Sequence, residues 1–165
     1  MQNLINNEII FEEDTLNGKY LTFFIENQSY GIEIKHVTEI ISIQPITEMP
    51  DIPEYVKGII NLRGRVIPLI DVRLRFKKET AEYTSKTSII VIDIMDKSIG
   101  LIVDYVNEVI TISENDMVES TIINSDFNNR YIKGFGKIGN EIILLLDCMK
   151  LLTQDELKDV SEVLL

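Results

Sequence analysis

The sequence predicts a mainly β protein made of two similar small barrels followed by one helix. Three observations support this prediction: the chain contains an internal repeat, each copy consists of short β-rich runs separated by turn residues, and the one clear helix-start pattern lies near the end. With 165 residues, the chain is long enough for one ordinary domain or two very small ones.

The repeat appears in two alignments that preserve the order of the chain. Residues 20–43 align without a gap to residues 89–112, with a serine, a glycine, a glutamate and four aliphatic residues identical. Residues 56–76 align to residues 132–152, with a Lys-Gly pair, two aliphatic residues and an aspartate identical. Two matches in the same order indicate an internal duplication.

These patterns predict where the units begin and end. A polar junction poor in aliphatic residues follows the first copy, and the capping-box pattern Thr153-Gln-Asp-Glu156 follows the second. Two barrels this small are marginally stable alone, so we expect them to share an apolar seam. The predicted units are a loose N-terminal tail (1–18), a first barrel (19–84), a second barrel (85–152) and an amphipathic helix (153–165).

Composition excludes several classes of partner. The chain carries 27 acids against 16 bases, a formal net charge of −11, so nucleic acids and anionic membrane surfaces are poor candidates. The first residues lack the pattern of a signal peptide, and no apolar run reaches the roughly 20 residues of a membrane span. The single Cys148 excludes an internal disulfide and fits a reducing cytosol. We therefore expect a soluble protein that binds other proteins or small molecules.

A search for catalytic groups predicts no enzyme, no cofactor and no metal. His36 is the only histidine, Cys148 lies beside an apolar strand, and the literal G-x-G-x-x-G at residues 134–139 precedes a strand rather than a helix. One remote alternative is an acid hydrolase that uses Asp71 and Asp147, one from each copy. The plainer interpretation makes each aspartate a cap where a strand turns into a short helix.

The two copies differ most at a hairpin tip in the first copy. Arg63 stands there beside Gly64, where the second copy has Gly139 and Asn140. Further basic residues follow it, namely Arg65, Arg73, Arg75, Lys77 and Lys78. Such clustering in an acidic chain predicts either one cationic surface for an acidic partner or ordinary solvated strand and helix faces. Val37 and Glu39 lie on another divergent strand, which is either part of an apolar groove for a helix or part of the core.

The runs YGIEIKHVTEI, VKGIINLRGRVIPLIDVRLRF and IGLIVDYVNEVITI resemble the CheW-like domain family of bacterial chemotaxis coupling proteins. The resemblance covers about residues 19–152, and the NLRG–IP–D signature at fixed spacing is its most specific part. It implies a fold of two five-stranded, SH3-like β-barrels. It also implies a non-catalytic, free-standing adaptor, because the chain has no room for a kinase or a receiver domain.

The same resemblance implies two partners. The cytoplasmic helical hairpin of a chemoreceptor would dock in a groove between the barrels, at Val37, Glu39, Gly58, Asn61 and Arg63. The regulatory domain of the histidine kinase CheA would bind barrel edges, at Ile40, Ser88 and Val109. The implied location is the cytoplasm, at receptor arrays beneath the inner membrane. A scaffold of the same fold in a different sensory or motility pathway is the alternative.

Overall fold

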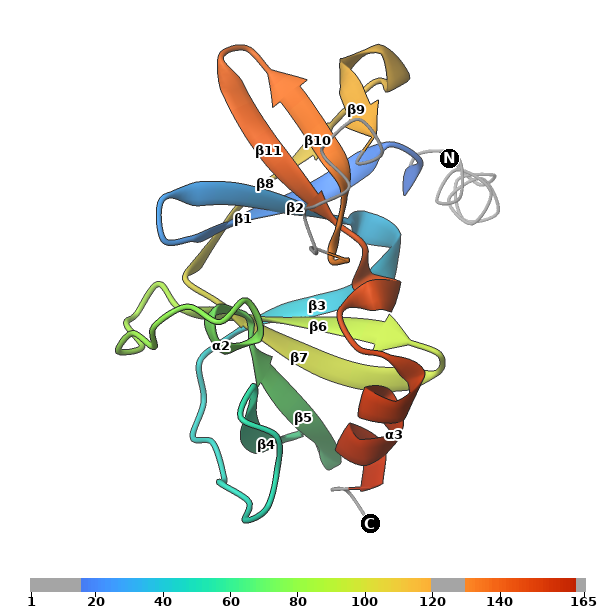
Figure 1. Cartoon of the computed structure of the whole chain (residues 1–165). Helices are drawn as coiled ribbons and strands as arrows, with labels where there is room; N and C mark the ends of the chain where they lie inside the picture. Colours follow the sequence, from blue (N-terminus) through green and yellow to red (C-terminus); the bar gives the residue numbers. More distant parts are fainter. Residues whose placement is uncertain (1–15, 120–129, 163–165) are drawn as a thin grey trace, which may run out of the picture.

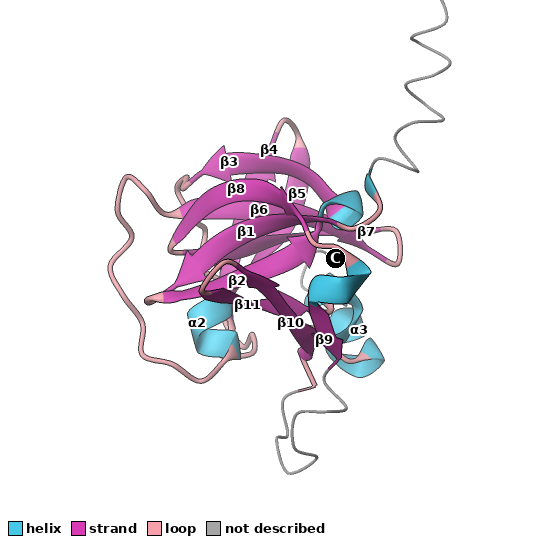
Figure 2. Ribbon diagram, turned by 90° about the horizontal axis from the view of Figure 1, so that it is seen from above, coloured by secondary structure: helices cyan, strands magenta, loops and turns pink. Residues whose placement is uncertain are grey.

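The computed structural model describes residues 16–119 and 130–162, which form two strongly curved β-sheets and a C-terminal helix (Figures 1 and 2). The predicted mainly β fold is confirmed, although no closed barrel is found among the residues described. Apart from residues 16–18, the predicted N-terminal tail lies outside these ranges. No helix in the described ranges is long and apolar enough to cross a bilayer.

One sheet has five strands in the order β3-β6-β7-β5-β4. Its strands are β3 (Val37–Ser42), β4 (Val56–Leu62), β5 (Arg65–Asp71), β6 (Ser88–Ile94) and β7 (Lys97–Val103). Neighbouring strands are antiparallel except β5 and β7, which are parallel. Beyond β3 the chain bends back to β4, where Thr47 and Ile59 exchange two backbone hydrogen bonds of 2.9 Å. This single bridge brings the continuation of one edge strand to the other edge.

The other sheet has six strands in the order β8-β1-β2-β11-β10-β9. Its strands are β1 (Lys19–Ile25), β2 (Gln28–Glu33), β8 (Tyr105–Thr111), β9 (Met117–Glu119), β10 (Ile132–Ile138) and β11 (Glu141–Leu146). Here β2 and β11 are the parallel pair. The short β9 continues the chain from β8 and pairs with β10, as Thr47 pairs with β4 in the first sheet. Strands that match in the sequence repeat therefore occupy equivalent places in the two sheets.

The predicted division into separate barrels at residues 84 and 85 is wrong, because the two segments exchange hairpins. The β1–β2 hairpin of the first segment lies in the six-stranded sheet, between β8 and β11. The β6–β7 hairpin of the second segment lies in the five-stranded sheet, between β3 and β5. Each sheet thus contains one hairpin from one segment and the remaining strands from the other.

Glycines permit close packing beside the two parallel pairings that hold the exchanged hairpins. Leu69 of β5 lies opposite Gly100 of β7, and Leu145 of β11 lies opposite Gly31 of β2. A Cβ atom on Gly100 would lie 2.4 Å from Leu69 Cδ2 and 2.8 Å from Ile89 Cγ2, and both side chains are fully buried. On Gly31 the nearest atom, Leu145 Cδ2, would be 3.2 Å away.

Gly100→Ala is therefore expected to lower the free energy of unfolding by about 1–3 kcal/mol, because buried neighbours leave no space for a methyl group. Gly31→Ala is the matched control in the other sheet, and its looser contact predicts the smaller loss. Urea unfolding followed by circular dichroism measures both values. Equal losses for the two variants would contradict this packing argument.

The largest apolar cluster lies between the sheets and confirms the predicted seam. It includes residues from both sheets, such as Phe23 and Ile32 of the six-stranded sheet and Ile90 and Leu101 of the five-stranded sheet. Smaller clusters fill the interior of each sheet. The five-stranded sheet encloses Ile60, Leu62, Ile67, Leu69, Ile89, Val91 and Ile102, and the six-stranded sheet encloses Tyr20, Ile112, Ile143 and Leu145. Because the shared cluster is the largest, burial of apolar surface favours the joined sheets over the separated ones.

The C-terminal helix α3 (Gln154–Glu162) begins as the capping-box pattern predicts. The Glu156 backbone N–H donates to Thr153 Oγ1 at 3.0 Å, and the Thr153 backbone N–H donates to Glu156 Oε1 at 2.8 Å. Leu157 and Val160 of the predicted apolar stripe are buried in the seam. Leu164, its last member, lies outside the described residues.

Candidate protein-docking surface

The β4–β5 turn presents Arg63 on a rigid support. Arg63 and Gly64 both have positive φ, 52° and 85°, as the two central residues of a type I′ hairpin turn require. The Asn61 side-chain oxygen accepts a hydrogen bond of 2.8 Å from the Gly64 backbone N–H and fixes the turn. The Arg63 side chain is 70% exposed, so the predicted outward-facing guanidinium is present.

The guanidinium of Arg63 forms an ion pair with Glu39 of β3. This contact joins strands at opposite edges of the five-stranded sheet, since β3 and the β4–β5 turn are brought together by its curvature. The Glu39 side chain is only 28% exposed, whereas its partner is largely in solvent. The result is a fixed acid–base pair at the surface, with an arginine that can still bind a second acceptor.

Two of the predicted receptor residues have structural surroundings. Val37 is partly buried and packs against the seam between the sheets. Gly58 is buried at a bulge in the β4–β5 pairing and has φ 151°, a region that other residues rarely adopt. The structure therefore brings Glu39, Asn61 and Arg63 to the surface near one another and places Gly58 beneath the bend at Thr47.

The three predicted kinase residues fall on two separate edges. Ile40 on β3 is 44% exposed, and Val109 on β8, its equivalent in the repeat, is 50% exposed. Both strands are edge strands, one in each sheet. Ser88 lies at the start of β6, where it pairs with Ser42 at the end of β3. Ile40 and Ser88 thus share the five-stranded sheet, while Val109 belongs to the other one.

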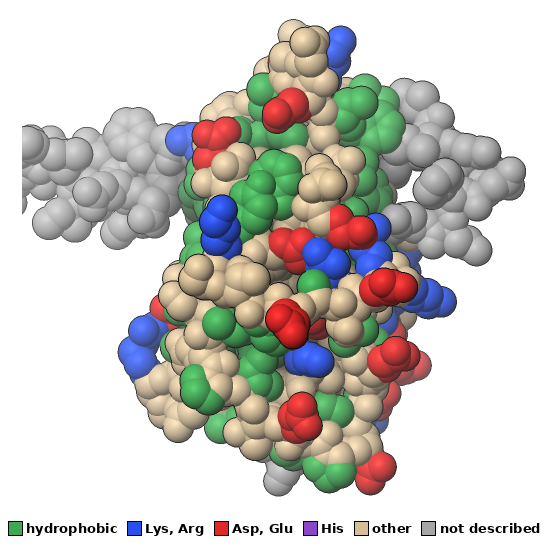
Figure 3. All heavy atoms as spheres, turned by 90° about the vertical axis from the view of Figure 1, so that its left-hand side faces the viewer, with side chains coloured by type: hydrophobic (Ala, Val, Ile, Leu, Met, Phe, Trp, Pro, Cys, Tyr) green, Lys and Arg blue, Asp and Glu red, His purple; other side chains and the backbone are tan. Residues whose placement is uncertain are grey.

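The predicted cationic surface is wrong, because the basic residues after Arg63 are dispersed. Arg75 of α2 (Val72–Arg75) is buried, donates to the Leu151 carbonyl and to Glu156 at 2.9 Å each, and lies over the Tyr55 ring. Arg73 of the same helix binds Asp104. Figure 3 shows Lys and Arg side chains interspersed with Asp and Glu on this face. Alternating directions along a strand and a helical turn sent neighbouring charges to different places.

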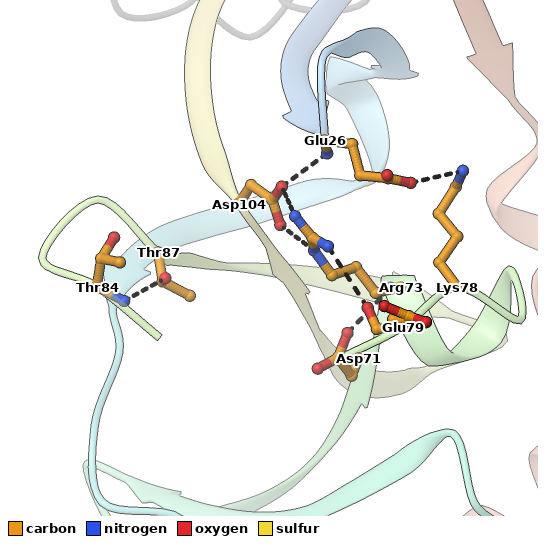
Figure 4. Close-up of polar contacts among 8 residues, drawn as sticks. All are labelled: Glu26, Asp71, Arg73, Lys78, Glu79, Thr84, Thr87 and Asp104. Carbon is orange, nitrogen blue, oxygen red and sulfur yellow. Dashed lines mark hydrogen bonds and ion pairs between the residues drawn. The ribbon is translucent and has the colours of Figure 1, made fainter. Parts of the chain in front are cut away.

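A polar cluster joins the β1–β2 turn to the five-stranded sheet (Figure 4). The Asp104 carboxylate accepts from Arg73 Nε at 2.7 Å, from Arg73 Nη2 at 2.5 Å and from the Glu26 backbone N–H at 2.7 Å. The Glu26 carboxylate pairs with Lys78 at 2.8 Å, and the hydrogen bond from Lys78 lowers the pKa of Glu26. This cluster, Glu26, Arg73, Lys78 and Asp104, fastens one exchanged hairpin to the opposite sheet.

The aspartates of the hydrolase alternative serve as caps, as the plainer interpretation predicted. Asp71 accepts from the Arg73 backbone N–H at 2.9 Å and from the Tyr83 hydroxyl at 2.8 Å. Burial and this hydrogen bond raise the pKa of Tyr83. Asp147 accepts from the Met149 backbone N–H at 3.0 Å. Both carboxylates therefore stabilise the start of a short helical turn after a strand.

Other titratable groups show no arrangement for catalysis. Burial raises the pKa of the Cys148 thiol to about 12, so the thiol stays protonated and unreactive at neutral pH. Within residues 16–119 and 130–162, no three His, Cys, Asp or Glu side chains gather closely enough to hold a metal ion. What the surface offers is apolar and charged contact area on edge strands and turns.

Exposed apolar residues that the repeat did not point to add to this area. They are Val66 on β5, Tyr105 on β8 and Ile142 on β11, together with Met95 and Met149. Strand alternation alone gave no signal for them, because an outward apolar residue looks the same in sequence as one that faces a neighbouring sheet. Their exposure follows from how the two sheets meet.

Comparisons with known proteins agree with this fold and surface. The model of the CheW-like domain family matches residues 19–156. Chemotaxis protein CheW of Klebsiella aerogenes is 30% identical over 91% of this chain and 90% of its own length, and that of Rhizobium meliloti is 34% identical over 82% and 88%. The crystal structure of the scaffolding protein TtCheW from Thermoanaerobacter tengcongensis superposes with a TM-score of 0.76 at 32% identity, covering 84% of this chain and 94% of that one. The chain belongs to the CheW-like family of non-catalytic chemotaxis scaffold proteins.

Proposed function

We propose that the chain couples the signalling tips of chemoreceptors to the histidine kinase CheA and transmits the receptor state to kinase activity. Membership of the chemotaxis scaffold family supports the adaptor role. The observation that carries the proposal is the fixed Glu39–Arg63 pair beside two exposed edge strands. These features give one protein several separate contact faces, as an adaptor between two partners needs.

The receptor contact is proposed at β3 and the β4–β5 turn. A helical hairpin would place polar side chains against Glu39 and Arg63 and apolar side chains near Val37. The turn is held by the Asn61 hydrogen bond, so little conformational entropy is lost when a partner binds. Gly58 contributes by allowing the bend at Thr47 that positions this region.

The kinase contacts are proposed at the two sheet edges. Ile40 with Ser88 would meet one regulatory domain, and Val109 would meet another, because the two sites belong to different sheets. Edge strands with exposed aliphatic residues are suited to docking another small β unit. We further propose that each curved sheet acts as an SH3-like barrel, with the six-stranded sheet carrying β9 in addition to the five expected strands.

An adaptor of this kind works in the cytoplasm at receptor arrays, which we propose as its location. Each contact can be weak, because an array offers many contacts at once and raises the effective concentration of every partner. The receptor state reaches the kinase only if the contacts differ in free energy between the two signalling states. A rigid block with an apolar seam passes such a difference on without losing it to internal motion.

Reconstitution of receptor, kinase and this chain tests the proposal. We expect Ile40→Glu and Val109→Glu to weaken kinase binding and receptor-dependent kinase activity at least about tenfold, because each buries a charge in an apolar contact. Phosphate incorporation into the kinase and a direct titration measure the two effects.

Ile142→Glu is the matched control, since Ile142 is 57% exposed but lies on β11, away from both edges. It should leave kinase activity unchanged. If the two edge variants behave like this control, the kinase contacts lie elsewhere. If the unaltered chain fails to bind receptor and kinase of its own organism, the scaffold serves another sensory pathway.

A further inference from the structure

A second apolar depression lies away from the proposed docking faces, where the β6–β7 turn meets α3 (Figure 1). We call it the methionine pocket. It has a volume of about 260 Å³ and is lined by Ile94, Met95, Arg130, Met149, Lys150, Leu152, Thr153, Gln154 and Leu157. Met95 is 54% exposed and Met149 is 44% exposed, so two flexible apolar side chains border an open apolar floor. Methionine side chains adapt readily to an apolar ligand.

The rim of the methionine pocket is cationic. Arg130 and Lys150 line it, and no acid does. The single Glu156 carboxylate faces both Arg75 and Arg130, at 2.9 and 2.8 Å, so it neutralises only one of these two charges. Within the described part of the chain, the Lys150 ammonium has no ion-pair partner. The pocket therefore favours an apolar group with acidic neighbours.

The chain itself contains such a segment. We propose that the methionine pocket binds Ile9-Ile10-Phe11 of the same molecule. Three consecutive large apolar residues are followed directly by Glu12, Glu13 and Asp14 and preceded by Glu8. The apolar residues would fill the pocket, and the acids would face Arg130 and Lys150.

The length of the chain before the described residues allows this contact. Seven residues separate Ile9 from Leu16, and an extended chain of seven residues reaches about 24 Å. A folded domain of this size has a radius of gyration of only about 15 Å. Figures 1 and 2 both show the described start of the chain on the side of the molecule that carries α3.

A second depression of equal volume lacks this complementarity and serves as a control. It is also about 260 Å³ and is lined by Gln44, Ile46, Glu48, Lys57 and Tyr83. Its one lysine is balanced by one glutamate, and it has no methionine lining. Met49 follows Glu48 directly, so the Met49 methyl group reports on this control site.

Nuclear magnetic resonance of methionine methyl groups tests the proposal in the full-length chain. We expect the triple variant Ile9→Ser, Ile10→Ser, Phe11→Ser to shift the Met95 and Met149 signals and to leave Met49 and Met117 in place. Hydrogen exchange gives a second measurement. Amides of residues 9–11 should exchange at least about tenfold more slowly in the unaltered chain than in Lys150→Glu, while Lys57→Glu at the control site should have no effect.

Unchanged Met95 and Met149 signals in the triple variant would overturn the proposal. Signals that depend on protein concentration would also overturn it, in favour of a segment supplied by a second copy. Neither result touches the receptor and kinase contacts, because the methionine pocket shares no residue with them.

Discussion

Replacing Gly58 by alanine is expected to lower the free energy of unfolding by about 2–5 kcal/mol, which is a large share of the stability of a domain this size. The added Cβ atom would lie 2.3 Å from the Thr47 carbonyl oxygen and 2.8 Å from Ile46 Cγ2. The oxygen cannot move away easily, because it accepts the Ile59 backbone hydrogen bond that holds the bend. In addition, φ of 151° strains any residue with a side chain.

Gly64→Ala separates the steric effect from backbone strain. Gly64 also has positive φ, 85°, but an added Cβ atom there would meet nothing within 4 Å. Its cost should stay near 1–2 kcal/mol, roughly the price of a left-handed residue alone. Chemical unfolding of both variants measures the difference. Equal losses would show that the bend at Thr47 tolerates displacement. Any loss of receptor binding in Gly58→Ala has to be corrected for the unfolded fraction.

Arg63→Glu is expected to weaken binding of a receptor signalling-tip fragment at least about tenfold while the fold survives. The reversal removes the arginine donors and places two carboxylates side by side at the proposed contact. Stability should change by less than about 1 kcal/mol, because the Arg63 side chain is 70% exposed and the pair is screened by water. Calorimetric titration gives the affinity, and urea unfolding gives the stability.

Arg65→Glu is the matched control for this charge reversal. Arg65 lies two residues further along the same hairpin, is exposed and contacts Ser98 instead of an acid. It should bind the receptor fragment nearly as well as the unaltered chain. The exchange Glu39→Arg with Arg63→Glu rebuilds the ion pair in reverse. Recovered affinity in this double variant would mean that the pair only shapes the turn and that the receptor reads neither charge.

Local features of the fold could be predicted from the sequence because a few neighbouring residues determine them. Thr153 and Glu156 cap a helix through hydrogen bonds only three residues apart. The Arg63–Gly64 turn follows from the preference of tight hairpins for residues that tolerate positive φ. Asp71 and Asp147 are caps for the same kind of reason.

The exchange of hairpins could not be predicted, because it depends on which distant strands pair. Aliphatic runs such as Ile89–Ile92 fit against either sheet, and the repeat makes the two candidate neighbours alike. The clue was present only in the two glycines that pack against Leu69 and Leu145, and a glycine in a strand has several explanations.

The place of Arg75 was missed for a related reason. A sequence lists basic residues side by side, but the change from strand to helix at Asp71 turns this one inward, between Tyr55 and Tyr131. The outward direction of Arg63 was predictable because a hairpin tip has solvent around it. Charge spacing therefore indicates a surface patch only where the backbone direction is known.

The crossing points between the sheets are very short. From β2 the chain reaches β3 through the turn Ile34–His36, and from β7 it reaches β8 through Asp104 alone. Both edge strands are therefore covalent continuations of a hairpin anchored in the opposite sheet. A partner that displaces one edge pulls directly on the far half of the molecule, with no slack linker to absorb the movement. Push and response travel along the polypeptide itself, and the carboxylate at position 104, gripped by Arg73, is the pivot.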